Sequence, residues 1–132
     1  MTPILPSTIS QPNGTYVHGL TVPSGAQLLF VSGQIPVHRD GTIPKNFKDQ
    51  AALVFYNIAE ILREAGSGIE HIVKITSFLT DVTSIPEFAA VRAGFLQDHR
   101  PTSTLLVVSA LAKPELLVEV EAIAMIPEGS RR

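Results

Sequence analysis

The sequence contains no cysteine. This absence excludes disulfide bonds, metal sites built on thiolates and cysteine nucleophiles. The sequence also lacks an apolar run of the roughly 20 residues that a membrane-spanning helix needs, so we expect no membrane partner. Its first residues show no basic segment followed by an apolar one, unlike a signal peptide, and we therefore expect a cytoplasmic protein.

Clustered charge is scarce as well. The net charge is −2, and the lysines and arginines are scattered, whereas a nucleic-acid-binding protein normally carries a basic cluster. No two histidines stand four residues apart as metal ligands on a helix would, and no glycine-rich loop opens a helix to hold a phosphate. We therefore expect no nucleic-acid partner, no metal and no cofactor. The histidines are His18, His38, His71 and His99.

Apolar residues are plentiful: they make up 45% of the 132 residues, against 17% charged residues. A chain of this length closes one hydrophobic core, so residues 1–132 are predicted to form a single domain with its core at about 16–126. This apolar excess is high for a small monomer. We expect part of the apolar surface to face another subunit.

Two helices are predicted. The first is indicated by apolar residues that recur at alternating four- and three-residue spacing, and it should end near Ala65, before a left-handed cap at Gly66. These residues are Phe47, Ala51, Val54, Ile58, Ile61 and Ala65. The second begins at Ser84-Ile85-Pro86-Glu87, which matches a capping box, and should run to about Gln97.

Five segments rich in β-branched and apolar residues are predicted to be strands. They are Tyr16–Leu20 and Gln27–Ser32, expected to pair as a hairpin, then Ile69–Thr80, Thr104–Ser109 and Leu116–Met125. The order β-β-α-β-α-β-β predicts an α+β fold, a mixed sheet with both helices on one face. A partner subunit is one way to cover the other face. The expected core includes Ile72, Phe78, Val107 and Val118.

Three features could carry chemistry. In Val118-Glu119-Val120-Glu121-Ala122, strand alternation places both carboxylates on one face. An ordinary solvated strand face would show the same pattern. A tyrosine such as Tyr16 is more often a packed aromatic residue than a catalytic group, and Ser32-Gly33-Gln34 could be a turn that ends a strand. The residues alone therefore indicate a soluble α+β domain with a carboxylate pair.

Several stretches together resemble the RidA family, also called the YjgF or L-PSP endoribonuclease family. They are Tyr16-Val17-His18-Gly19, Val31-Ser32-Gly33-Gln34-Ile35-Pro36, Gln50 with Asn57-Ile58, Ala65-Gly66, Val73-Lys74, Thr80-Asp81 and Val118-Glu119-Val120-Glu121-Ala122-Ile123-Ala124. The resemblance implies a chorismate-mutase-like fold, a homotrimer with clefts between subunits, and cofactor-free hydrolysis of reactive enamines or imines such as 2-aminoacrylate. It assigns Glu119 to water activation, and Tyr16, Ser32 and Gly33 to the cleft.

One position departs from the family pattern. Active members read Pro-Ala-Arg-Ser where this chain reads Pro101-Thr102-Ser103-Thr104, so Ser103 stands in place of the arginine that binds the substrate carboxylate. A serine hydroxyl cannot neutralise a carboxylate, and the lost contact is worth about 1.5–3 kcal/mol of binding. Arg92 and Arg100 are candidates to compensate, Arg92 being preferred because it lies on a helix, although exposed arginines are usually solvated.

Three hypotheses follow. The first is an enamine or imine deaminase, a hydrolase of C–N bonds, with a substrate other than 2-aminoacrylate. In it Glu119 positions water, and neutral hydrogen bonds in place of the arginine come from Thr102, Ser103 and Thr104. The second is a trimer that binds or senses a small ligand without catalysis. The third, an endoribonuclease, is disfavoured by the net charge of −2.

Overall fold

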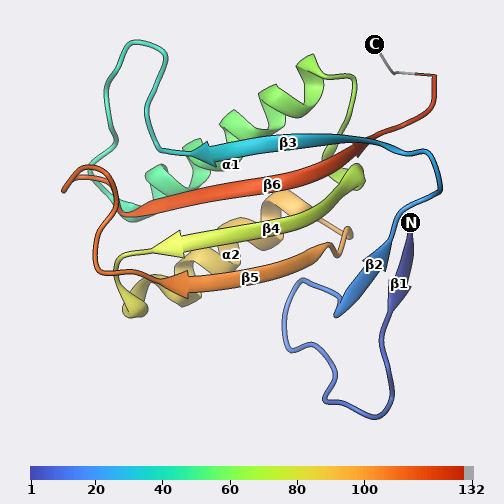
Figure 1. Cartoon of the computed structure of the whole chain (residues 1–132). Helices are drawn as coiled ribbons and strands as arrows, with labels where there is room; N and C mark the ends of the chain where they lie inside the picture. The colour runs from blue at the N-terminus through green and yellow to red at the C-terminus, as the bar shows by residue number, and fades with distance from the viewer. Residues whose placement is uncertain (130–132) are drawn as a thin grey trace.

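The computed structural model describes residues 1–129. Two helices lie on one face of a four-stranded mixed sheet, and a two-stranded ribbon stands at one end (Figure 1). The strands are β1 Thr2–Ile4, β2 Gly19–Thr21, β3 Gln27–Gln34, β4 Ile72–Leu79, β5 Thr102–Val107 and β6 Val118–Ile126. The helices are α1 Phe47–Glu64 and α2 Ile85–Leu96. The predicted α+β fold is confirmed, with β1 as an additional strand.

Helix α1 is defined at both ends by local chemistry. The side chain of Asn46 accepts a hydrogen bond from the Asp49 backbone N–H at 2.8 Å, which satisfies one of the free donors of the first turn. At the other end Ala65 is the cap residue, and Gly66 takes a positive φ of 79° that costs a glycine little. The predicted end near Ala65 is confirmed.

Helix α2 begins where the sequence predicts, but a different side chain makes the hydrogen bond at its start. The side chain of Ser84 makes no capping hydrogen bond, so the predicted capping box is wrong. Asp81 instead accepts from the Thr83 backbone N–H at 2.9 Å and starts a 3₁₀ turn over Val82–Ser84. Because Ser84 already has helical dihedral angles inside that turn, its side chain is not placed to cap the helix that follows.

The predicted hairpin of the first two strands is also wrong. A turn does form between them, with the Ala26 N–H donating to the Pro23 carbonyl at 3.2 Å. However, β2 pairs antiparallel with β1, whereas β3 pairs antiparallel with β6. Turn residues show where the chain reverses but not which strand becomes the partner, and the nine-residue β6 offers β3 a far longer ladder than β2.

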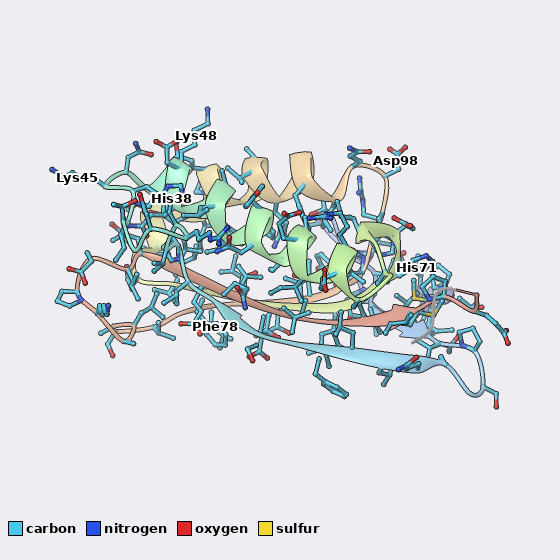
Figure 2. All side chains as sticks on the ribbon, turned by 90° about the horizontal axis from the view of Figure 1, so that it is seen from above. His38, Lys45, Lys48, His71, Phe78 and Asp98 are labelled. Carbon is cyan, nitrogen blue, oxygen red and sulfur yellow. The ribbon has the colours of Figure 1, made fainter. Side chains whose placement is uncertain are left out.

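The sheet order is β3-β6-β4-β5, with β4 and β5 parallel and the other pairs antiparallel. Both helices cover one face, which Figure 2 shows from the edge of the sheet. Strand alternation sends every second residue of β6 toward the helices, and all of them are buried. These residues are Val118, Val120, Ala122, Ala124 and Ile126.

Two of the four predicted core residues, Ile72 and Val118, are fully buried, and the other two are not. Phe78 is in register with Glu119 and lies on the face away from the helices (Figure 2), because alternation gives the helix face to its neighbours in β4. Val107 ends the edge strand β5 and is 45% exposed. Apolar character alone does not identify which face a strand residue occupies.

Within residues 1–129, no helix combines the length and the apolar character that crossing a membrane requires.

Candidate functional site

The backbone of β3 is irregular at Ser32 and Gly33. Val31 is in register with Ala122 and Gln34 with Val120, so two residues of β3 face a single residue of β6. This is a β-bulge, a feature that re-aims side chains and is common beside active sites. The register shift falls on the Ser-Gly pair that the sequence had identified.

Glu119 lies against this bulge. It is in register with Phe78, which places its carboxylate on the sheet face that the helices leave open. A Cβ added to Gly33 would lie 3.0 Å from the Glu119 carboxyl carbon and 3.2 Å from its Cγ, closer than ordinary contact. The missing side chain of Gly33 is therefore what allows the carboxylate to take this position. We call Ser32, Gly33 and Glu119 the carboxylate cluster.

Two further predicted residues, Tyr16 and Arg92, lie together with Thr15 at the opposite end of the sheet. The Nε–H of Arg92, on α2, donates a hydrogen bond to the Thr15 hydroxyl at 3.1 Å. Gly14 lies between the two side chains, since a Cβ there would be 3.5 Å from the Tyr16 ring and 3.9 Å from Nη2 of Arg92. We call Thr15, Tyr16 and Arg92 the arginine cluster.

The guanidinium of Arg92 is half-buried. Its central carbon lies 5.6 Å from the centroid of the Phe88 ring, a distance typical of a cation–π contact. Burial lowers the pKa of Arg92, and an electrostatic contribution from Tyr16 acts in the opposite direction. An arginine nevertheless stays protonated at any ordinary pH, so the site keeps its positive charge.

Ser103, on β5, lies at the same end of the sheet as this cluster, and its side chain is on the face that the helices cover. Its register partner is Ile75, which is buried under the helices, so Ser103 faces the helix side of the sheet. The Val17 N–H donates to the Pro101 carbonyl at 3.0 Å, which ties the segment after Tyr16 to the start of β5. The arginine cluster and Ser103 therefore share one end of the sheet.

Arg100 does not join them. One of its terminal nitrogens, Nη1, donates to the backbone carbonyls of Gln97 and His99, at 2.6 and 3.0 Å. The side chain thus stabilises the loop between α2 and β5. Of the two arginines proposed to compensate for Ser103, the structure places Arg92 beside Tyr16 and turns Arg100 back onto its own loop.

The two clusters lie apart within one chain. β5 begins at the end of the sheet beside β1 and β2, whereas β3 ends and β6 begins at the other end (Figure 1). Through Ile75, Ser103 is aligned with Ala122, three residues from Glu119 and two strands away. By strand geometry, Ser103 and Glu119 are therefore about 10 Å apart along the strands and about 10 Å apart across them, and they lie on opposite faces of the sheet.

Sequence reasoning missed Thr15, because nothing in the sequence pairs a loop residue with an arginine 77 positions later. It also missed the bulge itself, although a glycine within a strand is a known signal for one. Across residues 1–129, no three histidine, aspartate or glutamate side chains converge to hold a metal ion.

Comparison with known proteins gives consistent matches. The family model described as Endoribonuclease L-PSP matches residues 8–126. Protein HMF1 of Saccharomyces cerevisiae is 32% identical over 94% of both chains. The Escherichia coli protein named "Putative reactive intermediate deaminase TdcF" is 36% identical over 85% of this chain and 87% of its own. The solved structure of YyfB, a Rid-family protein from Yersinia pestis, has a TM-score of 0.84 and 26% identity, covering 94% of this chain and 97% of YyfB.

Proposed function

Because this chain belongs to the endoribonuclease L-PSP family, also called the RidA or YjgF family, we propose that it hydrolyses a small reactive imine or enamine to a carbonyl compound and ammonia. The observation that carries this proposal is the position of Glu119, a carboxylate on the open sheet face beside the bulge at Gly33. The name of the TdcF relative supports it.

The proposed reaction needs a base and water but no redox partner. An enamine first takes a proton on carbon and becomes an imine. Glu119 accepts a proton from water as the oxygen adds to the imine carbon, and that proton then passes to the nitrogen. The hydroxyl of the resulting carbinolamine then gives its proton, through Glu119, to the nitrogen; the C–N bond breaks, ammonia leaves with the electron pair of that bond, and the carbonyl forms. In this proposal Tyr16, Ser32 and Gly33 line the cleft that holds the substrate, and Ser103 lies near it.

We further propose that the protein is a homotrimer with its clefts between subunits. Large apolar side chains on the open sheet face support this, since a monomer would leave them in water. Phe30 is 71% exposed in the single chain, and Leu28 and Leu106 are more than 40% exposed. The separation of the two clusters also supports it, because a neighbouring subunit can supply the cluster that one chain's cleft lacks.

Ammonia release from imines generated in the assay tests the function. An amino-acid oxidase produces 2-imino acids, and an amine oxidase produces uncharged imines. We expect the protein to accelerate ammonia release from at least one of these classes above the rate in water. No acceleration of either class at stoichiometric protein would contradict the proposal.

Ser103 favours a second candidate, a trimer that binds a small ligand without catalysis. Small keto acids, amino acids and aromatic carboxylates should then raise the melting temperature, since a ligand that binds only the folded state stabilises it. Saturable binding by a protein that hydrolyses no imine would favour this candidate. An absence of any shift would count against it.

A further inference from the structure

One polar side chain of α1 lies wholly inside the protein. Gln50 is 1% exposed, and its side-chain amide makes three hydrogen bonds of 2.8 Å to backbone groups. The amide nitrogen donates to the carbonyls of Pro44 and Glu115, and the amide oxygen accepts from the N–H of Leu117. Because both of its protons and its oxygen are used, the amide is held in one orientation and holds its partners in turn.

The partners of Gln50 come from the two loops that adjoin the carboxylate cluster. Pro44 belongs to the loop from β3 to α1, which leaves the sheet just after the bulge at Gly33. Leu117 ends the loop from β5 to β6, two residues before Glu119. Figure 1 shows that β3 ends and β6 begins at the same end of the sheet, beside the start of α1. Gln50 therefore joins the exit of one cluster strand to the entrance of the other.

A second amide of α1 acts on the same region. Asn57 follows Gln50 by seven residues, about two helical turns, and so lies on the same side of α1. Its Nδ2 donates to the carbonyl of Ile35, the first residue after β3, at 3.3 Å. The exit of β3 and the entrance of β6 are thus both tied to one helix.

We propose that Gln50 is a positioning residue for Glu119, because it sets how closely the entrance of β6 lies against the bulge. This inference rests on the proposed function. Glu119 is the second residue of β6, so the ladder continues from it in one direction and the loop held by Gln50 lies in the other. Its carboxylate fits where a side chain at Gly33 would be. A small shift of the strand entrance would therefore move the base relative to the substrate, and catalysis depends steeply on such distances.

A buried amide that served stability alone would make the same contacts, and the other end of β6 offers a control for that role. There the Ser67 hydroxyl donates to the Met125 carbonyl at 2.7 Å, a partly buried contact from the segment after α1. Ser67→Ala therefore removes a hydrogen bond to β6, as Gln50→Leu removes bonds beside it, but far from Glu119. A role limited to stability predicts that the two folded variants behave alike.

The first readout is kcat/KM for imine hydrolysis, measured in a double-mutant cycle with the Glu119→Gln variant. We expect Gln50→Leu to lower kcat/KM about tenfold or more in the wild-type background, and Ser67→Ala to leave it within about twofold. In the Glu119→Gln background, Gln50→Leu should lower it by less than about threefold, since the group that it positions is already lost. The same factor in both backgrounds would overturn the inference, because the effect would then not pass through Glu119.

The second readout is amide hydrogen exchange along β6, which needs no activity. Gln50→Leu should speed exchange about tenfold or more over residues 118–120 and leave residues 124–126 unchanged, whereas Ser67→Ala should do the reverse. Unchanged exchange over 118–120 in Gln50→Leu would overturn the inference even if imine hydrolysis is found. Faster exchange there, in a protein whose wild type hydrolyses no imine, would instead overturn the proposed function and leave the positioning of Glu119 standing.

Should Gln50→Leu not fold, Gln50→Asn keeps the amide on a side chain one methylene shorter, which cannot reach all three partners. We expect it to lower kcat/KM about threefold or more and to speed exchange over the same residues of β6. A wild-type value for either measurement would overturn the inference.

Discussion

The carboxylate cluster and the arginine cluster are built in different ways. Glu119 and Gly33 sit on adjacent strands of the sheet, and ladder register with a bulge determines where the carboxylate lies. Arg92 instead reaches across from a helix on a long side chain, held by one hydrogen bond to a loop residue and by one aromatic ring. The first cluster is fixed by the backbone, and the second by side-chain contacts.

This difference suggests a division of labour. A base that places water must hold its geometry closely, and strand interiors are the most precise positions a fold offers. A group that selects the substrate can vary in position as the substrate varies, and a helix surface residue is easily exchanged. If Ser103 replaces the family arginine, as the resemblance implies, the cation of Arg92 at the same end of the sheet agrees with this view.

Separating the two clusters should have the largest effect. Phe30→Asp places a charge on the open sheet face, where the proposed trimer would bury it unpaired. We expect monomers by light scattering after gel filtration, and complete loss of imine hydrolysis because no cleft forms. Tyr56→Asp is the matched control, as Tyr56 is 60% exposed on the outer side of α1, and it should leave the mass unchanged. A trimeric Phe30→Asp protein would contradict the assembly.

Removing the base should come next. Glu119→Gln keeps the shape of the side chain but cannot accept a proton from water, so we expect kcat/KM for imine hydrolysis to fall about 100-fold or more. Glu121→Gln is the control, because Glu121 lies on the same face one step along β6 and is exposed. If the two substitutions lowered kcat/KM equally, the proposed catalytic role of Glu119 would be contradicted.

Moving the base should have a smaller effect. Gly33→Ala adds a methyl group that needs the space of the Glu119 side chain, so the carboxylate must shift and kcat/KM should fall about tenfold. Gly94→Ala is the control: its added methyl meets nothing within 4 Å, and alanine in α2 should raise the free energy of unfolding by up to about 1 kcal/mol. Full activity of Gly33→Ala would show that the position of Glu119 is not critical.

The sequence predicted best where local periodicity decides the structure. The apolar spacing of α1, its end at Ala65 and the alternation of Val118 to Ala122 all appear in the structure. Local periodicity could not predict which strands pair, because the pairing of β3 with β6 joins segments about ninety residues apart. The same limit explains why Phe78 was wrongly predicted to be in the core, since the sheet face that it occupies depends on the register of the neighbouring strands.

The candidate site likewise contains features that the sequence predicted and features that it did not. Gly33 and Glu119 carried a recognisable pattern along the strands, and the structure brings them together. The contact of Arg92 with Thr15 had no sequence signal, because a long side chain reaches many positions and the loop that it contacts has no periodicity. The proposed trimer would bring the two clusters together in one cleft.

Mixing two impaired variants tests this claim most directly. Glu119→Gln and Arg92→Gln proteins are unfolded, mixed in equal amounts and refolded together, and imine hydrolysis is compared with each variant refolded alone. If every cleft combines Glu119 of one subunit with Arg92 of another, about a quarter of the clefts in the mixed trimers contain both native residues, and about a quarter of the wild-type activity returns. Activity no higher than the mean of the two variants alone would contradict a shared cleft.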